Sequence, residues 1–170
     1  MLSKANYLQN ESVKLINYFH FASKREKIMK TTEMRSDCPI SSSLDIFGDK
    51  WSLLIVRDLM LYKSRTYGDF TKSEEKISTN ILANRLQLLE DNGIIIKLPY
   101  PGNKVKGLYK LSPKGVNLIP ALIEIALWGG KNISNTDDDS PFLKDAKKNK
   151  KKFLKKIMDN LLQDEETNID

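Results

Sequence analysis

The sequence has one histidine, His20, and one cysteine, Cys38, among its 170 residues. A single cysteine cannot form a disulfide within the chain, and with one histidine it leaves too few ligands for a His/Cys zinc site. The sequence also has no glycine-rich phosphate loop and no Gly-x-Ser-x-Gly motif. Its carboxylate pairs, such as Glu74-Glu75, lie in polar runs that are most simply solvated surface. We therefore expect no enzyme, no metal and no other cofactor.

Long hydrophobic runs are missing as well. No stretch approaches the roughly 18 uninterrupted apolar residues of a membrane span, and residues 1–14 lack the pattern of a signal peptide. The composition, 40% hydrophobic and 29% charged, can fill a core and keep the surface polar. The sequence thus predicts a soluble, cytoplasmic protein. Its formal net charge of +6 modestly favours an anionic partner.

A turn-rich stretch after residue 91 predicts a β-hairpin. Asn92-Gly93 leads into an expected strand over residues 94–100, and a second strand is expected over residues 108–111. The residues between the strands include four that favour turns, Pro101, Gly102, Asn103 and Gly107. Lys104 and Lys106 put positive charge at the tip, which suits contact with DNA phosphates or entry into the minor groove. An ordinary exposed hairpin would also carry lysines.

The segment before this hairpin, residues 78–91, predicts an amphipathic helix with Ser78 or Thr79 as its N-cap. At about 100° per residue, one side of this helix collects leucines, namely Leu82, Leu86 and Leu89. The opposite side collects short and amide side chains, namely Asn80, Ala83, Asn84 and Gln87. Asn and Gln can pair bidentately with adenine in the major groove. A plain solvated face would look the same. A preceding short helix, expected over residues 67–75 with Thr66 as N-cap, and the following hairpin favour a DNA reader.

Apolar residues predict further helices on both sides of this unit. Spacings of three and four run from Leu44 through Trp51 to Leu59 and describe a helix packed on the core. Trp51 is most simply a core anchor, with a ligand role as the alternative. Ser112-Pro113 begins a helix that is apolar around most of its circumference and that Gly129-Gly130 should end. One small domain cannot bury that much surface, so we expect a partner subunit to cover one side.

The chain divides into three regions. Residues 1–37 form an N-terminal extension, which we expect to be helical around a dense apolar cluster between Val13 and Ala22. Residues 38–133 form the central domain. Residues 134–170 form a lysine-rich C-terminal tail with eight basic and nine acidic residues, a net charge of −1. Apolar residues recur every four positions from Phe153 to Leu162 and predict a short amphipathic helix there. Its lysines suit DNA phosphates or an anionic membrane, but a solvated helix is the simpler interpretation.

Several short motifs of the central domain occur in a fixed order. They are Cys38-Pro39, Gly48-Asp49-Lys50-Trp51, Tyr67-Gly68-Asp69-Phe70, Ile77-Ser78, Arg85-Leu86, Leu89-Glu90, Tyr100-Pro101, Tyr109-Lys110-Leu111-Ser112, Pro120 and Trp128-Gly129. In this order, over about residues 38–131, they resemble the HxlR-type transcriptional regulators, a winged-helix family allied to the MarR group. One departure is Gly107-Leu108, where the family's wings usually carry an acidic residue beside the aromatic one. The implied fold is α+β and mainly helical: a winged helix-turn-helix with a small β-hairpin wing and terminal dimerisation helices.

This resemblance implies a homodimer that binds a pseudo-palindromic operator in double-stranded DNA and regulates transcription. Two-fold symmetry would place two recognition helices about 34 Å apart, one turn of DNA. The alternatives are a winged helix that binds another protein without recognising DNA, and a peripheral membrane protein that uses the lysine-rich tail. We expect no membrane partner, and the sequence names no small-molecule effector.

The candidate DNA-binding residues are Thr79, Asn80, Ala83, Asn84, Arg85, Gln87, Lys104 and Lys106. The amides would contact base edges, and the threonine and the lysines would position the duplex. For Arg85 two roles stay open: gripping a phosphate, or bracing the helix through an internal ion pair.

Cys38 is a candidate redox-sensing residue. Directly before Pro39 it can occupy a helix N-terminus, where the helix dipole favours the thiolate; Asp37 opposes that effect and Arg35 assists it. Several members of the resembled family sense oxidants or electrophiles through the cysteine at this position. With no second cysteine in the chain, oxidation would link two subunits or capture a small thiol. A small buried packing residue is the alternative.

Overall fold

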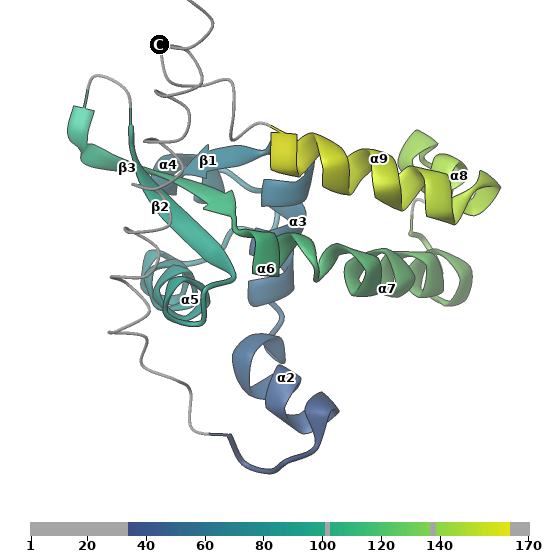
Figure 1. Cartoon of the computed structure of the whole chain (residues 1–170), viewed down its shortest axis with the longest axis horizontal. Helices are drawn as coiled ribbons and strands as arrows, with labels where there is room; N and C mark the ends of the chain where they lie inside the picture. The colour runs from purple at the N-terminus through teal and green to yellow at the C-terminus, as the bar shows by residue number, and fades with distance from the viewer. Residues whose placement is uncertain (1–33, 101–102, 137–138, 164–170) are drawn as a thin grey trace, which may run out of the picture. The chain divides into compact units, whose positions relative to one another are not determined.

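The structure is a computed structural model that describes residues 34–100, 103–136 and 139–163, without the side chains of residues 103–105 (Figure 1). The helix expected in the N-terminal extension falls mainly on residues 1–33, outside the described residues, as does His20. The described helices are α2 (Pro39–Phe47), α3 (Ser52–Tyr62), α4 (Tyr67–Phe70), α5 (Thr79–Asp91), α6 (Pro113–Val116), α7 (Ile119–Asn132), α8 (Pro141–Lys148) and α9 (Lys150–Gln163). The strands are β1 (Ser64–Thr66), β2 (Ile95–Tyr100) and β3 (Asn103–Leu111). The expected winged helix-turn-helix architecture, α+β and mainly helical, is confirmed.

The single helix expected between Leu44 and Leu59 is two helices, so that prediction was wrong. α2 ends at Gly48, whose N–H donates to the carbonyl oxygen of Leu44. A Cβ on Gly48 would lie 2.4 Å from that oxygen, so the close approach requires glycine. α3 then starts anew, because the Asp49 carboxylate accepts hydrogen bonds from the first N–H groups of the second helix.

The helix expected over residues 67–75 is shorter than predicted. α4 spans four residues, with Thr66 at its N-cap as expected. The Arg65 guanidinium donates to the carbonyl oxygen of Asp69 at 3.0 Å and so competes for a helical acceptor. From Lys72 the N–H groups reach back three residues instead of four, and Lys76 adopts a positive φ of 53° before α5 begins.

The sheet is antiparallel with strand order β1–β3–β2. The expected hairpin is present as β2 and β3, and Ile95 pairs with Leu111 at its base. The second strand is longer than predicted: β3 begins at Asn103, so Lys104, Lys106 and Gly107, expected between the strands, lie within it. β1 adds a strand that the sequence did not predict, pairing Arg65 with Tyr109. Gly93 has a φ of 67°, the left-handed conformation that ends α5 and directs the chain into β2.

The helix expected to begin at Ser112-Pro113 is interrupted. Ser112 caps α6 as expected, since its hydroxyl accepts a hydrogen bond from the N–H of Gly115 at 3.0 Å. α6 stops after one turn, and α7 begins at Ile119 with proline in its first turn. Gly129-Gly130 does not end α7, which continues to Asn132.

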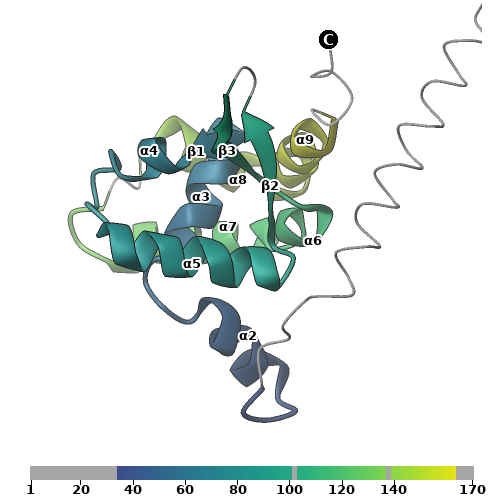
Figure 2. The same ribbon diagram turned by 90° about the vertical axis from the view of Figure 1, so that its left-hand side faces the viewer.

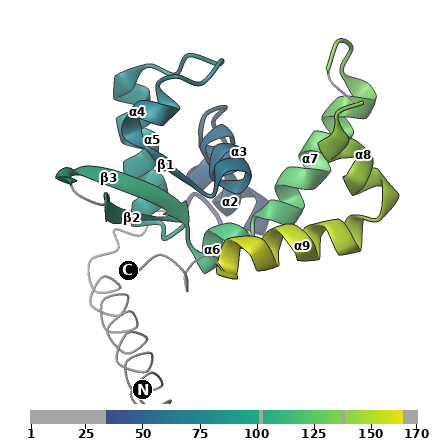
Figure 3. The same ribbon diagram turned by 90° about the horizontal axis from the view of Figure 1, so that it is seen from above.

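Two helices follow in the region expected to be a tail. α9 contains the apolar residues that recur every four positions, and α8 was not predicted. The two helices pack on each other and on α6 and α7 (Figure 3). Leu143 and Ala146 of α8 are buried, and Ala146 belongs to the same apolar cluster as the leucines of α5. No helix in the described part of the chain is long and apolar enough to span a membrane.

Candidate DNA-binding surface

The outward face of α5 carries the predicted base-reading residues. Leu82, Leu86 and Leu89 are buried, with exposed fractions of 0%, 3% and 0%. The residues on the opposite side, Asn80, Ala83, Asn84 and Gln87, are exposed, and so is Thr79 in the first turn. Figure 2 shows α5 lying across the front of the view, with β2 and β3 rising behind it. The helix therefore presents amide side chains to solvent beside the wing.

Arg85 differs from its neighbours, because it is half-buried and paired within the fold. Its Nη1 lies 3.2 Å from Oδ2 of Asp49. Asp49 also accepts hydrogen bonds from the N–H of Trp51 at 2.8 Å and from the hydroxyl of Ser52 at 2.5 Å. Of the two roles considered for Arg85, the structure shows the internal ion pair, which joins α5 to the start of α3. Trp51 itself is half-buried against the core, in agreement with the expected anchor role.

The pKa of Asp49 reflects these contacts. Burial alone would raise the pKa of this carboxyl group. The hydrogen bonds from Ser52 and Trp51, together with the charge of Arg85, outweigh burial and hold the pKa below its usual range. Asp49 is therefore ionised at neutral pH and serves as both the cap of α3 and the partner of α5.

Two of the exposed residues of α5 take part in hydrogen bonds within the protein. Nε2 of Gln87 donates to the Asp91 carboxylate at 2.7 Å, one helical turn away. The Tyr67 hydroxyl donates to the carbonyl oxygen of Thr79 at 2.7 Å and so ties α4 to the first turn of α5. Tyr67 was not among the sequence candidates, and only its place in the Tyr-Gly-Asp-Phe motif could have indicated it.

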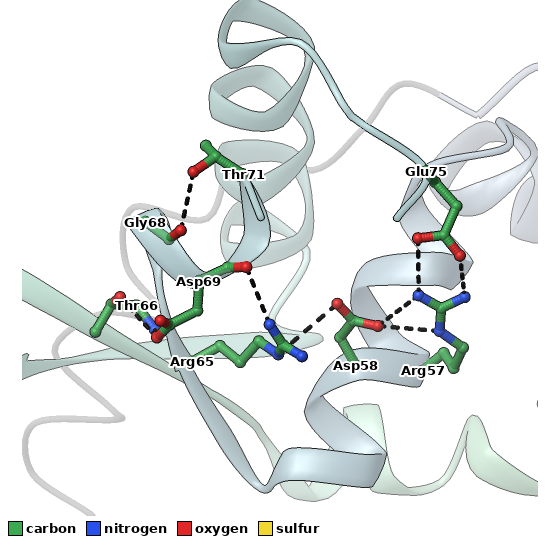
Figure 4. A network of polar contacts seen from close by, with 8 residues as sticks. All are labelled: Arg57, Asp58, Arg65, Thr66, Gly68, Asp69, Thr71 and Glu75. Carbon is green, nitrogen blue, oxygen red and sulfur yellow. Dashed lines mark hydrogen bonds and ion pairs between the residues drawn. The ribbon is translucent and has the colours of Figure 1, made fainter. Parts of the chain in front are cut away.

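A network of charged residues fixes the segment between α4 and α5 (Figure 4). Arg57 of α3 binds both Asp58 and Glu75. The hydrogen bond from Arg57 lowers the pKa of Glu75. Arg65 lies 3.8 Å from the buried carboxylate of Asp58 and holds the carbonyl of Asp69. The network fastens α4 and the turn after it to α3, and that turn determines where α5 begins.

The wing carries lysines next to aromatic rings. Lys106, a sequence candidate, is exposed, and its Nζ lies 5.2 Å from the ring centre of Tyr100. Lys97 of β2 is also exposed, and its Nζ lies 5.6 Å from the ring centre of Tyr109. The sequence analysis missed Lys97 because it considered only the lysines near the tip of the hairpin. The backbone of Lys104 lies in β3, but its side chain is outside the described residues.

Cys38 occupies the N-cap of α2, directly before Pro39, and is exposed. Hydrogen bonds from the backbone N–H groups of Ser41 and Ile40 lower the pKa of the thiol. Arg35, expected to assist the thiolate, is bound to Asp45. The chain by itself thus shows an accessible thiol rather than a buried packing residue.

Exposed apolar side chains lie on α2 and on α7, and together we call them the apolar surface. Ile40 and Leu44 of α2 are 72% and 51% exposed, and Ile125 and Trp128 of α7 are 52% and 63% exposed. Among the described residues there is no group of three His, Cys, Asp or Glu side chains that could hold a metal ion. The candidate binding features exposed on the described fold are therefore amides, lysines, one thiol and the apolar surface.

Comparison with known proteins identifies the family. The model of the HxlR-like helix-turn-helix family matches residues 46–137. The chain belongs to this family. The family and the relatives are transcriptional regulators, not enzymes, and the chain is a transcriptional regulator of the HxlR family.

Three relatives illustrate the match. YdeP of Bacillus subtilis (strain 168), an HTH-type transcriptional regulator, is 33% identical over 94 residues, which cover 55% of this chain and 73% of YdeP. The crystal structure of PA1607 is 36% identical with a TM-score of 0.54, covering 61% of this chain and 70% of that one. The redox regulator HypR in its oxidized form is 26% identical with a TM-score of 0.50, covering 56% of this chain and 97% of HypR. α9 lies beyond the residues that the HxlR family model matches.

The contacts of Asp49 generate a stability prediction. Asp49→Ala should lower the free energy of unfolding by about 1–2 kcal/mol near pH 7, because it removes the cap of α3 and leaves Arg85 without its partner. The folded-state pKa of Asp49 is depressed, so its contribution is present above the unfolded pKa of about 3.9 and is lost as pH falls through the folded pKa. Urea unfolding at several pH values should therefore show the difference at pH 5–8 and a narrowing gap below about pH 4.

Asp159→Ala on the exposed side of α9 is the control, with an expected change within about 0.5 kcal/mol. A pH-independent loss in Asp49→Ala would contradict the role assigned to the ionised carboxylate.

Proposed function

We propose that this HxlR-family regulator is a homodimer that binds a specific, pseudo-palindromic site in double-stranded DNA through α5. One observation carries the proposal: α5 exposes an amide face directly opposite its buried leucines. The ion pair between Arg85 and Asp49 and the network around Arg57 hold this helix in a fixed orientation. Preorganised amides on a helix beside a cationic hairpin are suited to reading base edges in a major groove.

The individual roles follow from the contacts of each side chain. The side-chain amides of Asn80 and Asn84 have no hydrogen bond to a described residue, so they can bond to base edges without breaking a contact in the protein. Gln87 must first exchange its hydrogen bond with Asp91. Ala83 leaves room for close approach between the amides. Thr79 and the wing residues Lys97, Lys104 and Lys106 would contact the phosphate backbone. Arg85 acts through the fold and not through DNA.

The apolar surface on α2 and α7 supports the homodimer. Each of its four large side chains is at least half exposed in the single chain, and a second copy related by two-fold symmetry would cover them. Dimerisation would also bring two copies of α5 to one DNA site.

Redox control through Cys38 belongs to the same proposal. The thiol lies at the N-cap of α2, and α2 carries Ile40 and Leu44 of the apolar surface. Oxidation of Cys38 would therefore act where the two subunits meet and alter the spacing of the two α5 helices. The relative HypR is described as a redox regulator.

Selection of bound fragments from the host genome should yield the operator, and Asn84→Ala then tests base reading. This variant should lose about 1–3 kcal/mol of binding at the selected site and little on random DNA, because Asn84 contributes sequence-specific hydrogen bonds. Fluorescence anisotropy with both duplexes measures the two affinities. Asn160→Ala on α9 is the matched control and should change neither. Equal losses on both duplexes in Asn84→Ala would show that Asn84 does not read bases.

Trp128→Ala tests the dimer. Removing the large exposed ring of α7 should weaken self-association by at least about tenfold, since exposed aromatic anchors dominate interfaces. Sedimentation equilibrium measures the dissociation constant. Leu162→Ala, an exposed apolar residue of α9 outside the α2–α7 surface, should leave it unchanged. A wild-type chain that sediments as a monomer at all concentrations would overturn the homodimer.

Treatment with diamide tests Cys38. The wild-type chain should change its operator affinity on oxidation and recover with dithiothreitol, because the exposed thiol has a lowered pKa. Cys38→Ser should bind operator DNA as the reduced protein does and should not respond to diamide. Identical responses of the two proteins would exclude Cys38 as the sensor.

A further inference from the structure

The outer face of α8 and α9 is a concentrated cationic surface. Eight lysines lie between residues 144 and 156, all exposed, whereas residues 141–163 contain two carboxylates, Asp145 and Asp159. We call the outward set on α9, namely Lys151, Lys152, Lys155 and Lys156, the lysine face. At 100° per residue Lys152, Lys155 and Lys156 lie opposite the apolar side of α9, and Lys151 lies at the edge of that side.

The lysine face is mounted on a helix that is fixed to the domain. The apolar side of α9 packs against the main core cluster through Phe153, Leu154, Ile157, Met158 and Leu161. The rings of Phe142 and Phe153 meet edge to face with centres 5.1 Å apart and join α8 to α9. The lysines therefore project from an anchored element and not from a solvated tail.

Two of the other lysines differ from the lysine face because they form ion pairs. Lys150 binds Glu124 of α7, and Lys144 lies 3.5 Å from Asp139. The four lysines of the lysine face form no ion pair with a described residue. Lysines four positions apart in a helix are neighbours, so like charges repel at each step along this face. An anion that binds there would relieve the repulsion.

We infer that the lysine face binds the phosphate backbone of duplex DNA without reading sequence. From Lys151 to Lys156 the helix rises about 7.5 Å, and duplex DNA carries one negative charge per roughly 1.7 Å of its axis. Four cations that have no ion pair to a described residue, on so short a rigid segment, match an extended line of phosphates. This surface is additional to α5 and does not depend on the proposed operator binding.

Two other kinds of partner, a membrane and another protein, fit the lysine face less well than DNA. A helix that lies on a membrane must insert its apolar side into the lipid, but the apolar side of α9 is already packed against the protein. Protein interfaces favour aromatic and apolar anchors over lysine, whereas on α9 the described residues offer a single exposed large apolar side chain, Leu162, near the end of the helix. DNA phosphates require only accessible cations.

The arrangement of the helices separates the two DNA-binding surfaces. Figure 1 shows α5 and the wing at the left and α7, α8 and the start of α9 at the right. One subunit can therefore hold its site through α5 and contact a second segment of DNA through the lysine face. The regulator would then bridge DNA segments or remain near DNA between binding events.

The test compares full-length variants on a random-sequence duplex. Replacing the four lysines of the lysine face by glutamine, also a good helix former, should weaken binding at least about tenfold near 0.1 M salt. The slope of log K against log salt should become shallower by up to roughly 3–4, about 0.9 for each phosphate that the protein no longer neutralises. Circular dichroism must show unchanged helix content.

A pair of double variants separates position from net charge. Lys151→Gln with Lys155→Gln should flatten the salt dependence more than Lys144→Gln with Lys150→Gln, which removes the same charge from paired lysines. Equal effects of the two double variants would overturn the inference, because net charge alone would then explain them.

Two further measurements distinguish other outcomes. The same quadruple change in an Asn84→Ala background should cause the same loss on random DNA, so failure of base reading by α5 leaves this test intact. Vesicles containing phosphatidylglycerol should bind the wild-type chain no better than the quadruple variant. Lysine-dependent binding to these vesicles, with unchanged binding to random DNA, would assign the lysine face to a membrane and overturn the inference.

Discussion

The orientation of α5 depends above all on the burial of its three leucines. Each buried leucine side chain contributes about 1.5–3 kcal/mol, whereas the half-exposed ion pair between Arg85 and Asp49 contributes at most about 1 kcal/mol. The leucines therefore decide which side of the helix faces the core, and helical geometry then forces Asn80 and Asn84 outward. The ion pair adds directional information that apolar contacts lack, since it fixes the position of α5 relative to the start of α3. The outward amides follow from a packing constraint that the sequence already shows.

This constraint explains why the central unit could be predicted from the sequence. The leucine spacing, the glycine after α5 and the turn residues of the hairpin are local signals, and the structure contains α5 and β2 close to the expected positions, whereas β3 begins five residues before the expected strand. The features that were missed depend on distant partners or on close approaches. The break at Gly48 depends on the carbonyl oxygen of Leu44, and the early end of α4 depends on Arg65. β1 exists because three residues find a partner in β3, more than forty positions further along the chain.

The apolar circumference of α7 shows how an inference from composition can be partly correct. The sequence indicated more apolar surface than one small domain can bury, and a partner subunit was the expected cover. In the structure, Ile119 and Ile123 face the core, and α8 and α9 cover a further part of the helix from within the same chain. Ile125 and Trp128 remain exposed. The apolar surface that α7 leaves for a second subunit is therefore narrower than the sequence suggested.

The net charge of a segment, like its apolar content, can differ from the charge that its folded surface presents. Residues 134–170 sum to −1, which placed the basicity of the chain elsewhere. Within residues 141–163, however, eight lysines accompany two aspartates, a net charge of +6 that equals the formal charge of the whole chain. Folding directs these lysines outward because the apolar side of α9 is needed against α6 and α7. A ligand responds to the local potential and not to the regional sum, so a segment that is neutral on average can still present a strongly cationic surface. The same apolar packing that stabilises the C-terminal helices thus concentrates their positive charge.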